Sequence, residues 1–184
     1  MPVSGRAQGL MLRDILSENK KDIVKRWADL TIDTYPPEAG SFMKNQKNQF
    51  ANPVGAAIAD GSETLFDWVI GSNSDYPPEL VRRLDDIVRI RAVQQFSASD
   101  AVGFLFLLRK IIKEKIPQKM IRDTNLFDEL VIIYSRIDSL ALTAFDIYMK
   151  CREKLFEIRA MEIRNRSSRI LERACMKYGA PHDW

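Results

Sequence analysis

The chain is poor in the residues that most often carry chemistry or cross-links. Its 184 residues include a single histidine, His182, and only two cysteines, Cys151 and Cys175. These residues are too few for a zinc site built from four nitrogen and sulfur ligands. On one straight helix the cysteines would lie roughly 36 Å apart, whereas the Cα atoms of a disulfide lie within about 7 Å of each other. We therefore expect a reduced protein without a bound metal.

The familiar signatures of enzymes and of membrane proteins are also missing. The sequence has no P-loop, no GxSxG and no GxGxxG, and no histidine is placed to activate a nucleophile. The acidic pair Asp85 and Asp86 is expected on an exposed helix face, where it would be solvated charge. The longest apolar runs, such as residues 101–108, are too short to cross a bilayer, and the first residues do not resemble a secretion signal. We expect a non-enzymatic, cytoplasmic protein without membrane insertion.

Proline and glycine are absent from residues 126–177, and this stretch dominates the chain. Apolar residues recur there at steps of four and three, which predicts the seam of a packed helix; they are Leu126, Leu130, Ile133, Ile137, Leu140 and Ala144. A helix of this length would extend about 75 Å, whereas a compact domain of this size has a radius of gyration of about 16 Å. The helix must therefore project from its domain or break.

The two halves of this stretch differ in pattern. Residues 134–149 are apolar around most of the helix, which predicts burial, whereas residues 151–184, here called the arm, carry a narrow apolar stripe among charges. The stripe, a predicted dimer or partner surface, consists of Leu155, Ile158, Met161, Ile170, Leu171 and Ala174. The same arm of a second copy could cover it, so we expect a homodimer.

The rest of the chain predicts further helices with clear end signals. Asn52 followed by Pro53 should cap a helix that runs to Ile70, and Ser97 with Asp100 forms an S-x-x-D box that opens another. The helix opened by this box should run over 98–116; other helices are expected at 10–16, 23–32 and 79–95, with a short helix and loop at 38–51. Asn125 could cap the long helix. No segment alternates with period two, so the fold class is all-α, with one helical domain at 1–150 and the arm at 151–184.

Three passages resemble a known family when they are taken together. TYPPEAGSFMKNQKNQFANPVG, IRAVQQFSASDAVGFLFLLRK and RIDSLALTAFDIYMKCREKLFEIRAMEIR resemble the N-terminal domain of the stressosome co-antagonist RsbRD. This resemblance implies a globin-like, haem-free sensor domain that forms dimers and passes a signal along a long C-terminal helix. In full-length co-antagonists a STAS domain follows, whereas the 184 residues leave no room for one. We expect a stand-alone signalling domain in stress response.

A globin-like fold raises the question of haem. Axial ligation usually needs a His, Cys, Met or Tyr aimed into the pocket. His182 lies three residues from the end of the chain, and Cys151 is expected to behave as a small hydrophobe. We expect no cofactor, and a colourless purified protein.

Asp138 has the apolar helical neighbours Tyr134, Ala141, Leu142 and Phe145, which predicts a buried carboxylate that needs a partner. Arg91 or Arg89 could supply that partner in a buried polar pair. A polar ligand site at Arg91 and Asp138, between helices that also carry Phe104, is the alternative.

The arm is basic, with nine basic and four acidic residues between 150 and 177. Its net charge of +5 contrasts with −2 for the remainder of the chain. Four arginines could lie along nucleic-acid phosphates; they are Arg164, Arg166, Arg169 and Arg173. Four glutamates interrupt this run and no aromatic platform accompanies it, so a docking surface for an acidic protein partner is favoured. A signalling dimer is the leading hypothesis; a small-ligand sensor and a nucleic-acid-binding protein are its rivals.

Overall fold

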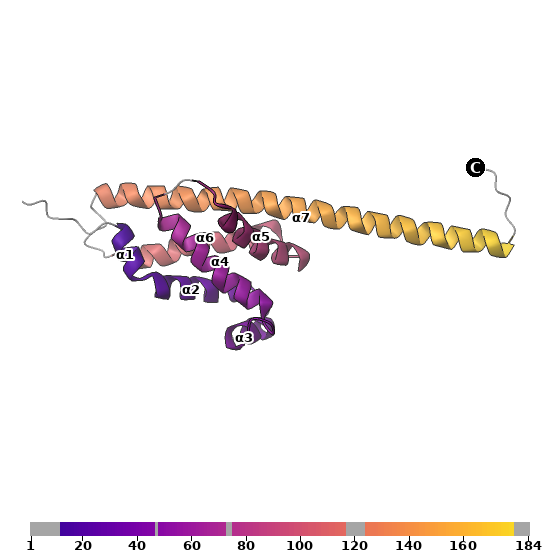
Figure 1. Ribbon diagram of the computed structural model, residues 1–184, viewed down its shortest axis with the longest axis horizontal. Helices are drawn as coiled ribbons and strands as arrows, with labels where there is room; N and C mark the ends of the chain where they lie inside the picture. Colours follow the sequence, from indigo (N-terminus) through magenta and orange to yellow (C-terminus); the bar gives the residue numbers. More distant parts are fainter. Residues whose placement is uncertain (1–11, 47, 73–74, 117–123, 179–184) are drawn as a thin grey trace, which may run out of the picture.

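The computed structural model describes residues 12–46, 48–72, 75–116 and 124–178, and within these residues every regular element is a helix. There are seven helices in this part of the chain (Figure 1). They are α1 (Leu12–Glu18), α2 (Lys20–Ile32), α3 (Pro37–Asn45), α4 (Pro53–Ile70), α5 (Pro78–Val93), α6 (Ala98–Lys115) and α7 (Thr124–Tyr178). The predicted all-α fold with a long C-terminal helix is confirmed. None of the described helices is long and apolar enough to span a membrane.

Short polar side chains fix where two of these helices begin. The Asn52 side chain accepts a hydrogen bond of 2.9 Å from the Gly55 N–H and donates to the carbonyl of Met43, so it caps α4 and holds the end of α3. Ser97 accepts from the Asp100 N–H at 3.1 Å and thereby caps α6. Both predicted caps are confirmed. Asn125 lies inside α7, which begins at Thr124, so it is not the expected cap.

Helix α7 lies along one side of a bundle formed by the other six helices (Figure 1). It packs mainly against α5 and α6, while α4 packs against α5 and α2. Gly61 allows the close approach of α4 and α5, because a Cβ atom built there would lie 2.5 Å from Cδ1 of Ile87. The predicted inner seam of α7 is confirmed: Leu126, Ile133, Ile137, Leu140 and Ala144 are buried, and Leu130 packs partly against the core.

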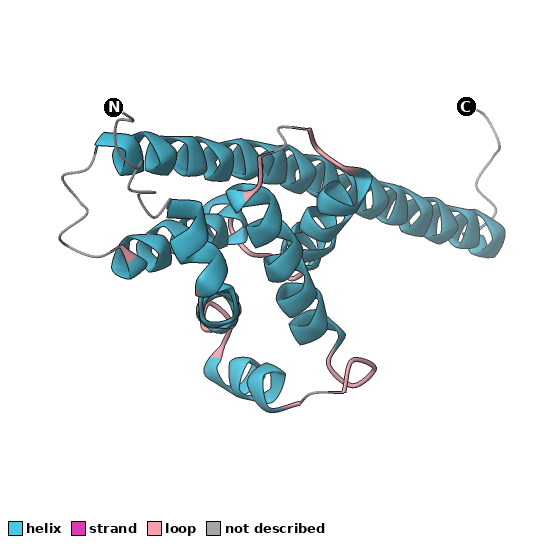
Figure 2. Cartoon of the chain, turned by 60° about the vertical axis from the view of Figure 1, so that its left-hand side comes forward, coloured by secondary structure: helices cyan, strands magenta, loops and turns pink. Residues whose placement is uncertain are grey.

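Helix α7 continues without a break for 55 residues and extends well beyond the bundle (Figures 1 and 2). Side chains of Cys151 and Leu155 are still half-buried, whereas those from Phe156 to Arg173 are exposed. The domain therefore ends on α7 near Leu155, and the helix beyond it projects. A boundary at residue 150, as expected from the sequence, falls within the continuous helix, and the separation into two domains stays a prediction.

The outer side of α7 is more exposed than the sequence predicted. Residues 134–149 were expected to be surrounded by other helices, yet Leu142 is 71% exposed, Phe145 45% and Met149 41%. The bundle covers mainly the inner side of α7, against which α5 and α6 pack most extensively, and it leaves these three side chains exposed. An apolar pattern around a helix therefore predicted burial that this single chain does not supply.

Candidate functional site

Arg91 on α5 is the largest buried polar side chain of the described core, with none of its surface exposed. Its guanidinium donates to the carbonyl of Asp100 at 2.7 Å, to the carbonyl of Thr31 at 3.0 Å and to the hydroxyl of Thr34 at 2.6 Å. Three aromatic rings surround it at about 5 Å from the guanidinium carbon; they belong to Tyr35 (5.1 Å), Phe96 (4.9 Å) and Phe104 (5.2 Å). We call this arrangement the Arg91 cage.

The Arg91 cage holds a cation without a carboxylate in hydrogen-bond contact. Burial is the main influence and lowers the pKa of Arg91, while Tyr35 and Asp100 act in the opposite direction. The Nε atom of Arg91 has no hydrogen-bond partner among the described residues. Because carbonyl dipoles and ring faces replace a counter-ion here, the cage joins α2, α5 and α6 without an ion pair.

A hollow of about 390 Å³ borders the Arg91 cage. Four of its lining residues also contact Arg91; they are Thr34, Phe96, Asp100 and Phe104. Gly103 lies on the same wall, and a Cβ atom built on it would meet nothing within 4 Å. The volume lies within the range of small-molecule pockets.

Asp138 is not paired with Arg91 or Arg89. Its side chain is 53% exposed and forms an ion pair with Arg109 of α6. Arg109 also donates to the carbonyl of Tyr134 at 3.1 Å and lies over the rings of Tyr134 and Phe106. The sequence-based pairing was wrong because Asp138 lies toward the outer side of α7, so its apolar sequence neighbours do not bury it.

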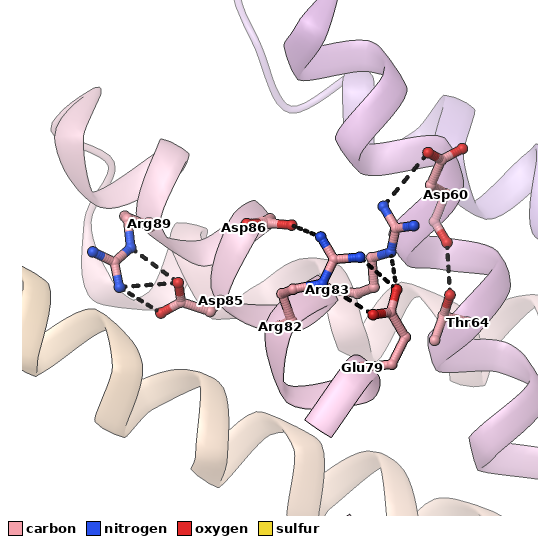
Figure 3. Close-up of polar contacts among 8 residues, drawn as sticks. All are labelled: Asp60, Thr64, Glu79, Arg82, Arg83, Asp85, Asp86 and Arg89. Atoms are coloured by element: carbon pink, nitrogen blue, oxygen red, sulfur yellow. Dashed lines mark hydrogen bonds and ion pairs between the residues drawn. The ribbon is translucent and has the colours of Figure 1, made fainter. Parts of the chain in front are cut away.

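Exposed ion pairs engage the other charges of α5 (Figure 3). Arg89 bonds to Asp85 through two hydrogen bonds of 3.0 Å, and Arg82 lies 3.8 Å from Asp86. Arg83 bridges Glu79 on its own helix and Asp60 on α4. Such exposed pairs contribute little each. The acidic pair Asp85 and Asp86 is therefore matched by arginines on its own helix.

The described residues offer few groups that could hold a metal or a cofactor. No group of three or more His, Cys, Asp or Glu side chains with metal-binding geometry occurs among them. Cys151 is half-buried on α7 and packs against the core, and Cys175 is exposed; both are free. His182 lies outside the described residues.

A second hollow, of about 500 Å³, lies between α2, α3 and α4. Its floor is apolar and includes Val24, Ile32 and Met43. Lysines and acidic residues share its rim, where Lys20 pairs with Glu63 at 2.9 Å and with Asp67 at 2.8 Å. The mixed rim gives this hollow no clear preference for a charged ligand.

The outer side of α7 carries an apolar row that we call the proximal face. It continues the α-helical spacing over four exposed side chains; they are Val131 (51% exposed), Leu142 (71%), Phe145 (45%) and Met149 (41%). Asp138 of the Arg109–Asp138 pair lies within the row, between Val131 and Leu142, and the row runs toward the arm on the same side of the helix. Sequence reasoning missed it because Leu142, Phe145 and Met149 were assigned to the core.

The predicted stripe on the arm does not lie on one side of the helix. At roughly 100° per residue along a continuous helix, Leu155 and Ile158 follow the inner side, Met161 lies between the two sides, and Ile170 and Leu171 lie toward the outer side. Only part of the stripe can therefore contact one straight partner.

An alternative row continues the proximal face, and we call it the distal seam: Phe156, Ala160, Ile163, Ser167 and Ile170.

Comparison with known proteins gives a family match over most of the chain. The sequence model of the RsbT co-antagonist protein rsbRD N-terminal domain matches residues 21–163. An uncharacterized protein of Archaeoglobus fulgidus is 23% identical over 145 residues, which covers 78% of this chain and 84% of the relative. No solved structure matches the chain significantly. The matched region contains the Arg91 cage, the proximal face and the beginning of the distal seam.

Proposed function

The chain belongs to the family of RsbT co-antagonist protein rsbRD N-terminal domains, and from this premise we propose that it is a non-enzymatic signalling domain that pairs with a second copy through the proximal face of α7. The family is that of a stressosome-related regulatory domain. The two free cysteines agree with a reducing compartment such as the cytoplasm. A regulatory domain of this kind acts through contacts rather than through chemistry, and α7 offers the surface for them.

The exposure of large apolar side chains on the proximal face is the observation that carries this proposal. Leu142 and Phe145 lie on the same helical stretch as Leu140 and Ala144, which are fully buried on the inner side. Large apolar side chains exposed along one side of a helix, interrupted here by Ser135 and Asp138, are typical of a surface that a partner covers. In a twofold dimer the α7 helices of two copies would lie against each other. The row is then self-complementary, because each copy presents the same side chains to the other.

The energetics of such a dimer are near balance. Fully burying one Leu, Phe, Met or Val side chain contributes about 1.5–3 kcal/mol. The four side chains of the face are 41–71% exposed, so pairing gains about half of this amount for each, or about 6–12 kcal/mol per dimer. Loss of translational and rotational freedom costs about 4–15 kcal/mol, and micromolar association needs about 8 kcal/mol net, so tight pairing needs further contacts beside these four side chains.

Sedimentation equilibrium tests the dimer. At tens of micromolar we expect the wild type to be dimeric and the double variant Leu142→Asp/Phe145→Asp to be monomeric, because each dimer would bury four new carboxylates. The matched control is Phe42→Asp/Phe50→Asp, which changes two exposed phenylalanines away from α7 and should stay dimeric. Circular dichroism checks that all three proteins are folded. A monomeric wild type, or a double variant that remains dimeric, contradicts the proposal.

A small-ligand sensor is the second candidate, supported by the hollow beside the Arg91 cage. The open space at Gly103 allows a direct test, since a Cβ atom there meets nothing within 4 Å and a leucine side chain would occupy part of the hollow. Native mass spectrometry of protein purified from its own cells should show a bound small molecule that is absent from Gly103→Leu. Ala160→Leu on the exposed arm is the control and should keep it. The same bound molecule on wild type and Gly103→Leu, or none on either, rules against the sensor.

A further inference from the structure

The helix beyond the domain has its own surface chemistry. Every described side chain from Phe156 to Arg173 whose exposure is given is exposed, so none of them is needed to hold the core. The distal seam steps by four, three, four and three residues, which is the spacing of a helix that packs against one other helix. Its members alternate in size: Phe156, Ile163 and Ile170 are large, whereas Ala160 and Ser167 are small.

Arginines border the distal seam on both sides. At roughly 100° per residue, Arg159, Arg166 and Arg173 form a column along one side, spaced by one heptad, and Arg164 lies on the other side. By the same rotation of about 100° per residue, Glu162 and Glu172 point away from the seam. Glu157 is the last acidic residue beside the seam, and it pairs with Lys154 at 3.0 Å. Beyond Glu157 the described residues place no acidic side chain beside the seam; Glu162, three residues from Arg159 and four from Arg166, lies on the far side of this arginine column.

A second copy of the chain does not complement this seam. In a parallel pair Ala160 would stack on Ala160 and Ser167 on Ser167, which leaves gaps in two layers, and Arg159 would lie near Arg164 of the other copy. An antiparallel pair would bring Arg166 beside its own counterpart and Arg159 beside Arg173. Like charges at these flanking positions oppose pairing.

Nucleic acid fits the seam less well than a helix does. Phosphates would engage the arginines, but the large apolar side chains of Phe156, Ile163 and Ile170 lie between the arginine rows, where a phosphate backbone offers no apolar contact. A helix with an apolar row and acidic flanks matches both features at once.

We propose that the distal seam docks an amphipathic helix of a partner protein that carries large apolar side chains along one row and glutamate or aspartate on both flanks. The large side chains fill the spaces over Ala160 and Ser167, and the carboxylates meet Arg159, Arg164, Arg166 and Arg173. This inference deepens the proposed function, because it names the kind of partner that a signalling dimer would engage through its projecting helices. It does not require that the proximal face form the dimer.

Fluorescence anisotropy with two designed peptides tests the docking. Each peptide is helical and about four heptads long, with leucine in the seam positions; one has glutamate and the other lysine at all flanking positions. Flanks of a single charge keep each peptide from pairing with itself. The full chain should bind the acidic peptide at least about tenfold more tightly than the basic one, and higher salt should weaken this binding.

Two charge-matched double variants locate the binding surface. Arg159→Glu/Arg166→Glu should reduce affinity for the acidic peptide at least about tenfold and should improve binding of the basic peptide. Lys150→Glu/Arg169→Glu changes the net charge equally on other sides of the helix and should leave the affinity within about twofold. All four positions are exposed, so both variants should stay folded.

Three results would overturn the docking proposal. The first is equal affinity for the acidic and the basic peptide. The second is an equal loss of affinity for the acidic peptide in the two double variants. The third is a higher affinity for a labelled DNA duplex than for the acidic peptide, together with weaker DNA binding in both double variants. Sedimentation of the same samples distinguishes failure of the docking proposal from failure of the dimer proposal. Loss of peptide binding in a protein that remains dimeric concerns only the distal seam. A monomeric protein that still binds the acidic peptide contradicts only the proximal dimer.

Discussion

The two halves of α7 share one helix and differ in almost everything that surrounds it. From Leu126 to Leu155 its inner side is packed against α5 and α6, and arginines tie it to neighbouring helix ends: Arg136 donates to the carbonyls of Trp68 and Gly71, and Arg152 to that of Ala92. From Phe156 to Arg173 the described side chains are exposed. The first half is thus stabilised by tertiary packing, and the second by helix propensity and connection to the first.

This difference shows that one periodic pattern can serve two purposes. The inner row of the first half completes the core of its own chain, whereas the outer row and the distal seam have the same kind of spacing and no partner within it. A substitution should therefore affect folding when it lies on the inner row and association when it lies on the outer one. Four comparisons of the free energy of unfolding follow. All are made at one protein concentration, so that any association contributes equally to the measured stabilities.

The largest effect is expected from Leu140→Ala. Leu140 is fully buried on the inner row, so the substitution should lower the free energy of unfolding by about 2–5 kcal/mol through lost burial and a cavity. Leu142→Ala, two residues further on and 71% exposed, is the control and should cost less than about 0.5 kcal/mol in dilute, monomeric protein. Urea denaturation followed by circular dichroism measures both. Similar losses in the two variants would contradict the division of α7 into inner and outer rows.

The second-largest effect on the free energy of unfolding is expected from Arg91→Met. This change keeps much of the side-chain volume but removes the hydrogen bonds from the guanidinium to the carbonyls of Thr31 and Asp100. The Thr31 carbonyl still accepts from the Thr34 hydroxyl at 2.7 Å, and we expect a loss of about 2 kcal/mol. Arg166→Met on the arm removes the same charge from an exposed position and should leave the urea midpoint unchanged. A neutral or stabilising Arg91→Met would mean that the desolvation of the guanidinium outweighs its hydrogen bonds.

A smaller effect is expected from Asp138→Ala. The Arg109–Asp138 pair is partly exposed, and Arg109 keeps its hydrogen bond to Tyr134 and its aromatic contacts without Asp138. The free energy of unfolding should fall by less than about 1 kcal/mol. The same urea titration measures it. A loss of about 3 kcal/mol or more, the size expected when a buried charge loses its partner, would show that Asp138 is buried in the folded protein.

The smallest effect is expected from truncation after Phe156. This cut keeps Arg152 stacked over the Phe156 ring and removes only the exposed part of α7. The free energy of unfolding should change by less than about 0.5 kcal/mol. Sedimentation of the truncated protein also tests the dimer, since the proximal face is retained. A marked loss of stability would show that the distal helix packs on the domain.

Helix ends were predicted well because local chemistry sets them. Asn52 and Ser97 cap α4 and α6 as expected, since a short polar side chain satisfies free N–H groups whatever the rest of the fold does. The inner row of α7 was also predictable from spacing. Phe145 and Met149 were misassigned because periodicity shows which residues are apolar but not which side of a helix a neighbour covers.

The candidate site was predicted only in part. Arg91 was singled out together with Phe104, but its hydrogen-bond partners were not, because the carbonyls of Thr31 and Asp100 leave no signal in the sequence and the rings of Tyr35 and Phe96 come from other segments. The need of a buried charge for a partner suggested a carboxylate. The fold instead supplied carbonyl dipoles and ring faces.

The sequence by itself determined that the chain is helical, that one helix is too long for its domain, and that this helix carries apolar residues at packing distance along its whole length. These features follow from local torsional preferences, capping groups and side-chain spacing, which act over a few residues. Only the tertiary structure decided which apolar row is buried, that Asp138 pairs with Arg109, and that Arg91 lies among aromatic rings. Those outcomes depend on how α5 and α6 cross α7, because contacts between residues far apart in the chain are fixed by the packing of whole helices.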